Sequence, residues 1–120
     1  LNDRVATVHK DHEGRVPTRS FIHVQDTCAA IDVLLRKGEV GQVYNVGAGE
    51  ELSIHQLVGL VARVLKQRDA WPSSEVMVGE ALTGCRRRVP HLGKIHGLGW
   101  GPTKTLDDAI RDLAAEVLCA

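Results

Sequence analysis

Two segments of this chain carry sequence signals for the start of a helix, and these signals constrain its fold more than any other feature. In a capping box, a Ser or Thr and the residue three positions later cap each other's backbone N–H groups. Ser53 with Gln56 and Thr105 with Asp108 both fit this pattern. Apolar residues recur at helical spacing after each box, so each segment predicts a helix with one buried face.

A third helix is expected over 27–37, with Asp26 as its N-cap and Gly38 as its end. Short segments rich in β-branched or aromatic residues lie between the helices and predict strands. The stronger strand candidates are Ser20–Val24 and Gln42–Val46, the weaker ones are Val5–His9 and Glu75–Val78, and a short helical turn is expected near His91–His96. Strands that alternate with helices favour an α/β fold, with parallel pairing where a helix intervenes.

The bulk composition excludes several classes of function. A chain of 120 residues forms one domain, expected over 1–120, with one modest core. The 15 basic residues balance the 15 acidic ones, so no net field attracts nucleic acid or an anionic membrane. No apolar run approaches the roughly 20 residues of a membrane helix. The odd number of cysteines, without a close pair, predicts free thiols and a cytoplasmic location: Cys28, Cys85 and Cys119.

The segment Gly47-Ala48-Gly49 invites comparison with a dinucleotide-binding fingerprint, because a predicted helix follows it. The third glycine of such a fingerprint is missing, since Leu52 stands there, and Glu50 and Glu51 would repel a pyrophosphate. A structural turn is therefore favoured over cofactor binding. A metal site is not expected either, because the histidines lack the i,i+4 spacing of a zinc helix and no cysteine pair completes a site.

Three segments resemble a known family when they are taken in order. They are Arg19-Ser20-Phe21-Ile22-His23-Val24-Gln25-Asp26, then Tyr44-Asn45-Val46-Gly47, then Leu98-Gly99-Trp100-Gly101-Pro102. Together they resemble the C-terminal, substrate-binding portion of the extended short-chain dehydrogenases/reductases, the NAD-dependent epimerases, 4,6-dehydratases and decarboxylases of nucleotide sugars. The resemblance implies a small mixed strand-helix domain that lacks the N-terminal Rossmann half.

The resemblance also bears on catalysis. The family uses a Tyr and a Lys four residues apart, whereas the fourth residue after Tyr44, the single tyrosine, is Ala48. No lysine is then placed to assist the tyrosine as a general base. We therefore expect no catalytic residue, no cofactor bound by this chain alone and no independent activity, although NAD serves the full-length family.

The same resemblance assigns candidate substrate-binding residues. It implies that Arg19 contacts the diphosphate of a nucleotide sugar, a role that suits a guanidinium; the alternative is an exposed arginine at a strand start. Three further arginines form either a second phosphate clamp or a solvated loop: Arg86, Arg87 and Arg88. Asn45 binds either the ligand or its own turn.

His91 and Gly93 replace the Asp and Ser of the family, which weakens the short helix by loss of side-chain capping. Trp100 is expected to pack in the core.

Two functions follow as expectations. The first is a non-catalytic lobe that binds a UDP- or dTDP-linked sugar, which requires Arg19 and the arginine run to converge on one pocket. The second is a self-associating interaction module or an inactive remnant, which requires a contiguous apolar patch on the helices around 28–35 and 57–65. A homo-oligomer is expected, because the predicted strands would otherwise leave exposed edges.

Overall fold

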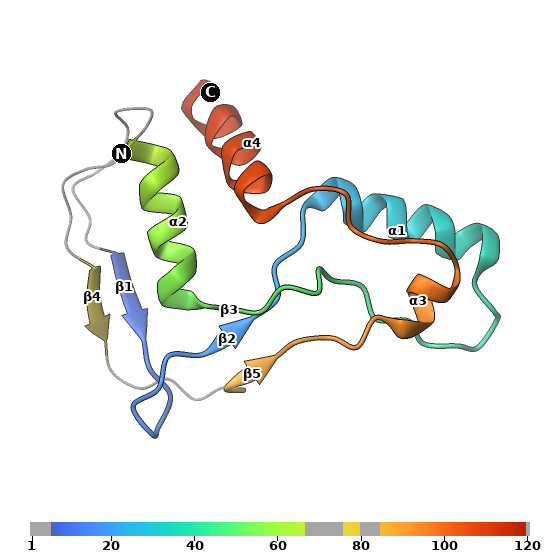
Figure 1. Cartoon of the computed structure of the whole chain (residues 1–120), viewed down its shortest axis with the longest axis horizontal. Helices are drawn as coiled ribbons and strands as arrows, with labels where there is room; N and C mark the ends of the chain where they lie inside the picture. The colour runs from blue at the N-terminus through green and yellow to red at the C-terminus, as the bar shows by residue number, and fades with distance from the viewer. Residues whose placement is uncertain (1–5, 67–75, 80–84, 120) are drawn as a thin grey trace.

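The computed structural model describes residues 6–66, 76–79 and 85–119 (Figure 1). The elements in chain order are β1 (Ala6–His9), β2 (Thr18–Arg19), α1 (Val24–Lys37), β3 (Leu52–Ser53), α2 (Ile54–Lys66), β4 (Val76–Gly79), β5 (Arg87–Arg88), α3 (Gly93–Gly97) and α4 (Leu106–Cys119). The predicted α/β class and the three long helices are confirmed.

The strands form two small sheets. β1 pairs with β4 in parallel, and β2 lies between β3 and β5. Within the second sheet, β2 is parallel to β5 but antiparallel to β3. The prediction of parallel pairing across an intervening helix is therefore wrong for β2 and β3. These strands have two residues each, and α1 does not cover their sheet as a crossover helix would, so right-handed crossover geometry does not apply.

The two stronger strand predictions are also wrong, because neither segment 20–24 nor segment 42–46 forms a ladder. Side chains take the place of backbone pairing there. The hydroxyl of Ser20 donates to the carbonyl of Ala48, and Asn45 Nδ2 donates to the carbonyl of His91 at 3.2 Å. The weaker predictions did better: β1 and β4 fall at the expected places, although Val5 and Glu75 lie outside the described residues.

Both capping boxes are confirmed. The Ser53 N–H donates to Gln56 Oε1 at 2.8 Å, and the Gln56 N–H donates to Ser53 Oγ at 3.1 Å. Thr105 and Asp108 exchange the equivalent hydrogen bonds at 3.0 and 3.1 Å. Local hydrogen bonding therefore sets the starts of α2 and α4.

Asp26 is not the N-cap of α1, contrary to prediction. The cap is His23, whose Nδ1 accepts the N–H of Gln25 at 3.0 Å. The helix thus begins earlier than expected, and Asp26 lies in its first turn, where the helix dipole favours a carboxylate. At the other end the N–H of Gly38 donates to the carbonyl of Leu34 at 2.8 Å and closes the helix as predicted.

One buried cluster joins α1 to α3. Its buried members are Ala30, Leu92, Ile95 and Trp100. Trp100 is packed as predicted, and its indole N–H donates to the carbonyl of Asp26 at 3.2 Å. The short helix α3 has no side-chain cap, in line with the loss of the family's capping residues. Burial of Ile95 and Leu92 holds α3 in place instead.

The carboxylate of Asp26 ties this cluster to the segment before α4. It is only 3% exposed, and it accepts hydrogen bonds from the Thr103 N–H, the Thr103 hydroxyl and the Lys104 N–H at 3.0, 2.8 and 3.0 Å. Burial acts to raise the pKa of Asp26, but the hydrogen bonds from Lys104 and Thr103 outweigh it and lower the pKa.

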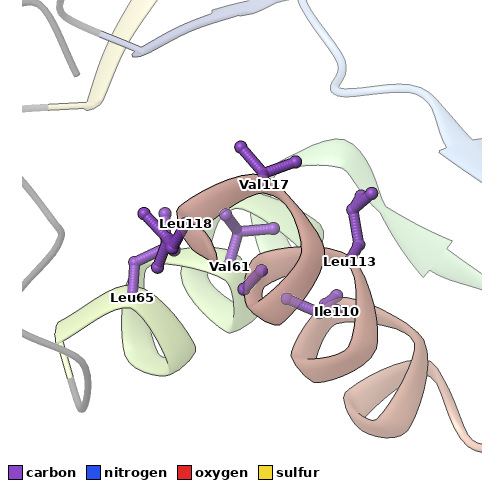
Figure 2. Close-up of a pocket in the computed structure, with 7 residues that line it drawn as sticks. Val61, Leu65, Ile110, Leu113, Val117 and Leu118 are labelled. Carbon is purple, nitrogen blue, oxygen red and sulfur yellow. The ribbon is translucent and has the colours of Figure 1, made fainter. Parts of the chain in front are cut away.

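A second buried cluster lies between α2 and α4, at the opposite end of the molecule (Figure 1). Its buried members are Val64, Ile110 and Ala114. The two helices bury only one side of their apolar faces. A groove remains open beside them (Figure 2), and its lining is Val61, Leu65, Ile110, Leu113, Ala114, Val117 and Leu118.

The molecule is flat, with principal extents of 49 × 39 × 18 Å. Its radius of gyration is 16.9 Å, whereas a compact domain of this length is expected near ~14 Å. The two clusters therefore lie side by side in a thin plate and do not form one central core.

Candidate functional site

A pocket of about 520 Å³ opens where three segments meet between the two clusters. Its lining comes from the end of β2 and the residues after it, from segment 45–47, and from β5 with the residues that follow. The lining residues are Arg19, Ser20, Ile22, Asn45, Val46, Gly47, Arg87, Arg88, Val89 and Pro90. Four of the five predicted substrate-binding residues are among them, so Arg19 and two arginines of the run, Arg87 and Arg88, converge on one pocket.

Strand pairing brings Arg19 next to Arg88. The two residues are direct partners in the parallel ladder of β2 and β5. Laterally paired residues project from the same face of a sheet, whereas consecutive ones alternate. Arg19 is steadied by its own strand and by β5, because Nη1 donates to the carbonyl of Thr18 at 2.7 Å and to that of Arg86 at 3.2 Å. Two guanidinium groups thus share one face of the sheet.

Arg87 is the neighbouring residue of β5, the edge strand of this sheet, and it also lines the pocket; its guanidinium contacts a carboxylate. Its Nε lies 3.0 Å from both carboxylate oxygens of Glu51, and its Nη2 lies 2.8 Å from Oε2. Thr18 Oγ1 donates to Glu51 Oε1 at 2.6 Å. The hydrogen bonds from Arg87 and then from Thr18 hold the pKa of Glu51 below its usual value, and Glu51 raises the pKa of Arg87.

The remaining two predicted residues have clear positions. The side chain of Arg86 does not line the pocket; its carbonyl accepts from Arg19 and from the Thr18 N–H at 2.9 Å, so Arg86 serves through its backbone. Asn45 lines the pocket, and its amide group bonds the distant carbonyl of His91 and not its own turn. Its Nδ2 therefore fixes the pocket wall.

Sequence reasoning missed several lining residues and the partner of Arg87. Gly47 is needed because a Cβ there would come within 2.6 Å of Pro90 Cγ, so the two residues close one wall together. Glu51 was seen only as a charge that would repel phosphate. No local signal identifies these contacts, since they join positions more than thirty residues apart in the chain.

The segment that resembles a dinucleotide fingerprint makes contacts within the protein. Gly47, the glycine that a fingerprint would use, lies against Pro90. In the loop that follows, the carboxylate of Glu51 accepts hydrogen bonds from Arg87. Tyr44 is part of the scaffold: its hydroxyl accepts the N–H of Glu39 at 3.1 Å, and its ring lies beside Lys94.

Two further observations concern the part of the chain that the structure describes. It contains no group of three or more His, Cys, Asp or Glu side chains arranged to hold a metal ion. None of its helices is long and apolar enough to cross a membrane.

The fold and the arginine pocket define the class to which the chain is related. No family model matches it. In overall structure it is similar to the dTDP-glucose 4,6-dehydratase of Bacillus anthracis, which was solved in complex with NAD, with a TM-score of 0.81 and 24% identity. That similarity covers 97% of this chain but 35% of the other. In that enzyme the corresponding region is one part of a larger fold.

Curated proteins extend the likeness to sequence. The chain is 33% identical over 92 residues to the low-salt glycan biosynthesis protein Agl12 of Haloferax volcanii. It is 30% identical over 103 residues to human dTDP-D-glucose 4,6-dehydratase. The alignments cover 77% and 83% of this chain, and the chain spans 29% of the length of each relative. The chain belongs with the extended short-chain dehydrogenases/reductases of nucleotide sugars, and it corresponds to their C-terminal portion.

Proposed function

We propose that this chain is a nucleotide-sugar-binding lobe without catalysis of its own, and that the pocket of Arg19 and Arg88 receives the diphosphate. One observation carries the proposal: the ladder of β2 and β5 brings these two arginines together in a pocket that Asn45 also lines. Guanidinium groups bind phosphate oxygens through paired, charge-assisted hydrogen bonds. The loop after Gly47 borders the space left for the sugar.

The substrate class follows from the relatives. The similar proteins include a dTDP-D-glucose 4,6-dehydratase and a trifunctional UDP-glucose 4,6-dehydratase, so UDP- and dTDP-linked sugars are the first candidates. Tyr44 lacks a lysine four residues later and its hydroxyl is held by Glu39. Epimerisation or dehydration therefore requires groups that the described residues do not supply.

A thermal-shift titration against UDP-, dTDP- and GDP-sugars tests the proposal, with NAD as a control ligand. A ligand at 100 times its Kd adds about 2.7 kcal/mol to the free energy of unfolding. That stabilisation raises the Tm of a domain of this size by several degrees. We expect a shift with one or more nucleotide sugars and none with NAD.

Two variants sharpen the test. Arg88→Gln removes a guanidinium that makes no hydrogen bond or ion pair among the described residues, so it leaves the folded state intact. Arg36→Gln is the matched control, since Arg36 lies in α1 and pairs with Asp32 outside the pocket. The proposal predicts that Arg88→Gln abolishes the shift and Arg36→Gln preserves it. No shift with any nucleotide sugar, or equal shifts in both variants, contradicts it.

Self-association is a second candidate function, and the groove between α2 and α4 favours it. Leu113 and Val117 on its rim are 61% and 58% exposed. The apolar patch was expected on the helices around 28–35 and 57–65. The groove lies on α2 and α4, and on α1 the side chains of Ile31 and Leu35 are exposed as well, at 52% and 82%. A second copy would cover the side chains on the rim of the groove. Light scattering of the wild type and of Leu113→Lys tests this: a dimer that Leu113→Lys dissociates supports it, and a concentrated monomer contradicts it.

A further inference from the structure

The arginines of the pocket differ in how free they are to meet a ligand. Arg88 makes no hydrogen bond or ion pair among the described residues. Arg19 donates hydrogen bonds to two backbone carbonyls through one terminal nitrogen, Nη1. Arg87 is different, because both its Nε and its Nη2 already contact the carboxylate of Glu51. The guanidinium edge that would grip a phosphate is thus occupied by two oxygens of the protein itself.

The position of Glu51 is fixed independently of Arg87. Thr18 Oγ1 donates to it at 2.6 Å, and the next residue, Leu52, pairs with Arg19 across β2 and β3. The carboxylate is therefore anchored on the same sheet that carries the arginines. Its side chain is one-third exposed, so a ligand that enters from solvent is able to displace it.

We propose that Glu51 is an internal competitor for phosphate: a nucleoside diphosphate first engages Arg19 and Arg88, and reaches Arg87 only by displacing the Glu51 carboxylate. The inference rests on the proposed function of the pocket as a diphosphate site. It assigns Glu51 the role of setting affinity, because the ion pair must be broken before the third guanidinium becomes available. Glu50 has the same charge in the same loop but contacts no arginine among the described residues.

The test measures binding of inorganic pyrophosphate and of UDP by isothermal titration calorimetry at low ionic strength. Glu51→Gln frees Arg87 and still offers Thr18 an acceptor, so the loop keeps its anchor. We expect Glu51→Gln to tighten binding about fivefold, the upper range for an exposed ion pair. Glu50→Gln, the matched control, removes an equal charge and is expected to change affinity less than about twofold.

A double-mutant cycle separates competition from general charge. In an Arg87→Gln background the same Glu51→Gln change frees no guanidinium, so its gain is expected to fall to that of Glu50→Gln. NMR of the arginine Nε–H groups adds a direct view of the order of binding. In the wild type the signals of Arg19 and Arg88 should move at lower pyrophosphate concentration than that of Arg87; in Glu51→Gln all three should move together.

The outcomes distinguish this inference from the proposed function. Equal affinities in Glu51→Gln and Glu50→Gln, in a protein that binds UDP-sugars, overturn the internal competitor and leave the lobe intact. Pyrophosphate binding that appears only in Glu51→Gln supports the competitor strongly. No binding of pyrophosphate or UDP by either the wild type or Glu51→Gln overturns both.

Discussion

The two ends of this molecule each have a small buried cluster, and the two clusters are stabilised in different ways. At the end formed by α1 and α3, Trp100 and Asp26 link distant segments through buried hydrogen bonds. At the end formed by α2 and α4, two amphipathic helices pack on each other and leave Leu113 and Val117 exposed. Both ends keep large apolar side chains exposed, such as Ile31 and Leu35 on α1 at the first end, but the second end gathers them around an apolar groove. The sheet of β2, β3 and β5 lies between the two ends (Figure 1), and residues of β2 and β5 line the arginine pocket.

The largest expected effect concerns Trp100, at the end formed by α1 and α3. Trp100→Ala removes a buried indole and its hydrogen bond to Asp26, and should lower the free energy of unfolding by about 3–5 kcal/mol. Leu113→Ala, at the other end, should change it by no more than about 0.5 kcal/mol. Urea unfolding measures both. Similar losses in the two variants would remove the distinction between the ends.

Asp26 should have the next largest effect. Asp26→Ala leaves the N–H groups of Thr103 and Lys104 without their acceptor in a buried site, at an expected cost of about 2–4 kcal/mol. Denaturant unfolding at neutral pH provides the measurement. Asp32→Ala, on the exposed face of the same helix, is the control and should cost far less.

The pH dependence of stability follows from the same carboxylate. The pKa of Asp26 is lowered in the folded state from its ordinary value of 3.8. The ionised Asp26 carboxylate therefore contributes its full share of the free energy of unfolding above the ordinary pKa of 3.8. This contribution is lost as the pH falls through the lower pKa of the folded state. Unfolding measured from pH 7 down to about pH 3 should show a steeper acid loss in the wild type than in Asp26→Asn. Parallel curves for the two proteins would contradict this role.

A smaller effect is expected at the pocket wall. Gly47→Ala places a Cβ within 2.6 Å of Pro90 Cγ, so it should cost about 1–3 kcal/mol through overpacking and weaken nucleotide-sugar binding. Gly49→Ala is a matched control, because a Cβ there meets nothing within 4 Å. Thermal unfolding and ligand titration of both variants check the prediction. Identical behaviour would show that the wall tolerates the methyl group.

The smallest effects belong to the helix starts. Ser53→Ala and Thr105→Ala each remove one half of a capping box, at about 1 kcal/mol. Since α2 and α4 pack on each other, the two losses should be similar and should appear in the same cooperative transition. Chemical unfolding of the single and double variants measures this; separate transitions would show that the helices fold independently.

The sequence predicts the helices well because their signals are local. The capping boxes at Ser53 and Thr105 depend on residues three positions apart, and the structure contains both. The strands were harder, since two-residue ladders such as Thr18–Arg19 against Arg87–Arg88 depend on a partner nearly seventy positions away. Asp26 was predicted as a helix cap because the sequence does not show that its carboxylate accepts hydrogen bonds from Thr103 and Lys104, which are far away in the chain.

The candidate site was predictable only in part, and for the same reason. The resemblance to a family pointed to Arg19 and to the arginine run, yet the run alone does not say which arginine is free. Pairing with Arg19 singles out Arg88, the contact with Glu51 restrains Arg87, and Arg86 contributes a carbonyl. Each of these assignments rests on sheet register, which a single sequence does not encode locally.

The most direct test of the central claim is an NMR titration of backbone amides with UDP-glucose and dTDP-glucose. The account predicts saturable shifts at segments 18–20, 45–47 and 87–90, with the amides of 110–118 in α4 unchanged. It also predicts that Arg88→Gln removes these shifts. Shifts concentrated along α2 and α4, or no saturable shift with either ligand, would contradict a diphosphate site on the central sheet.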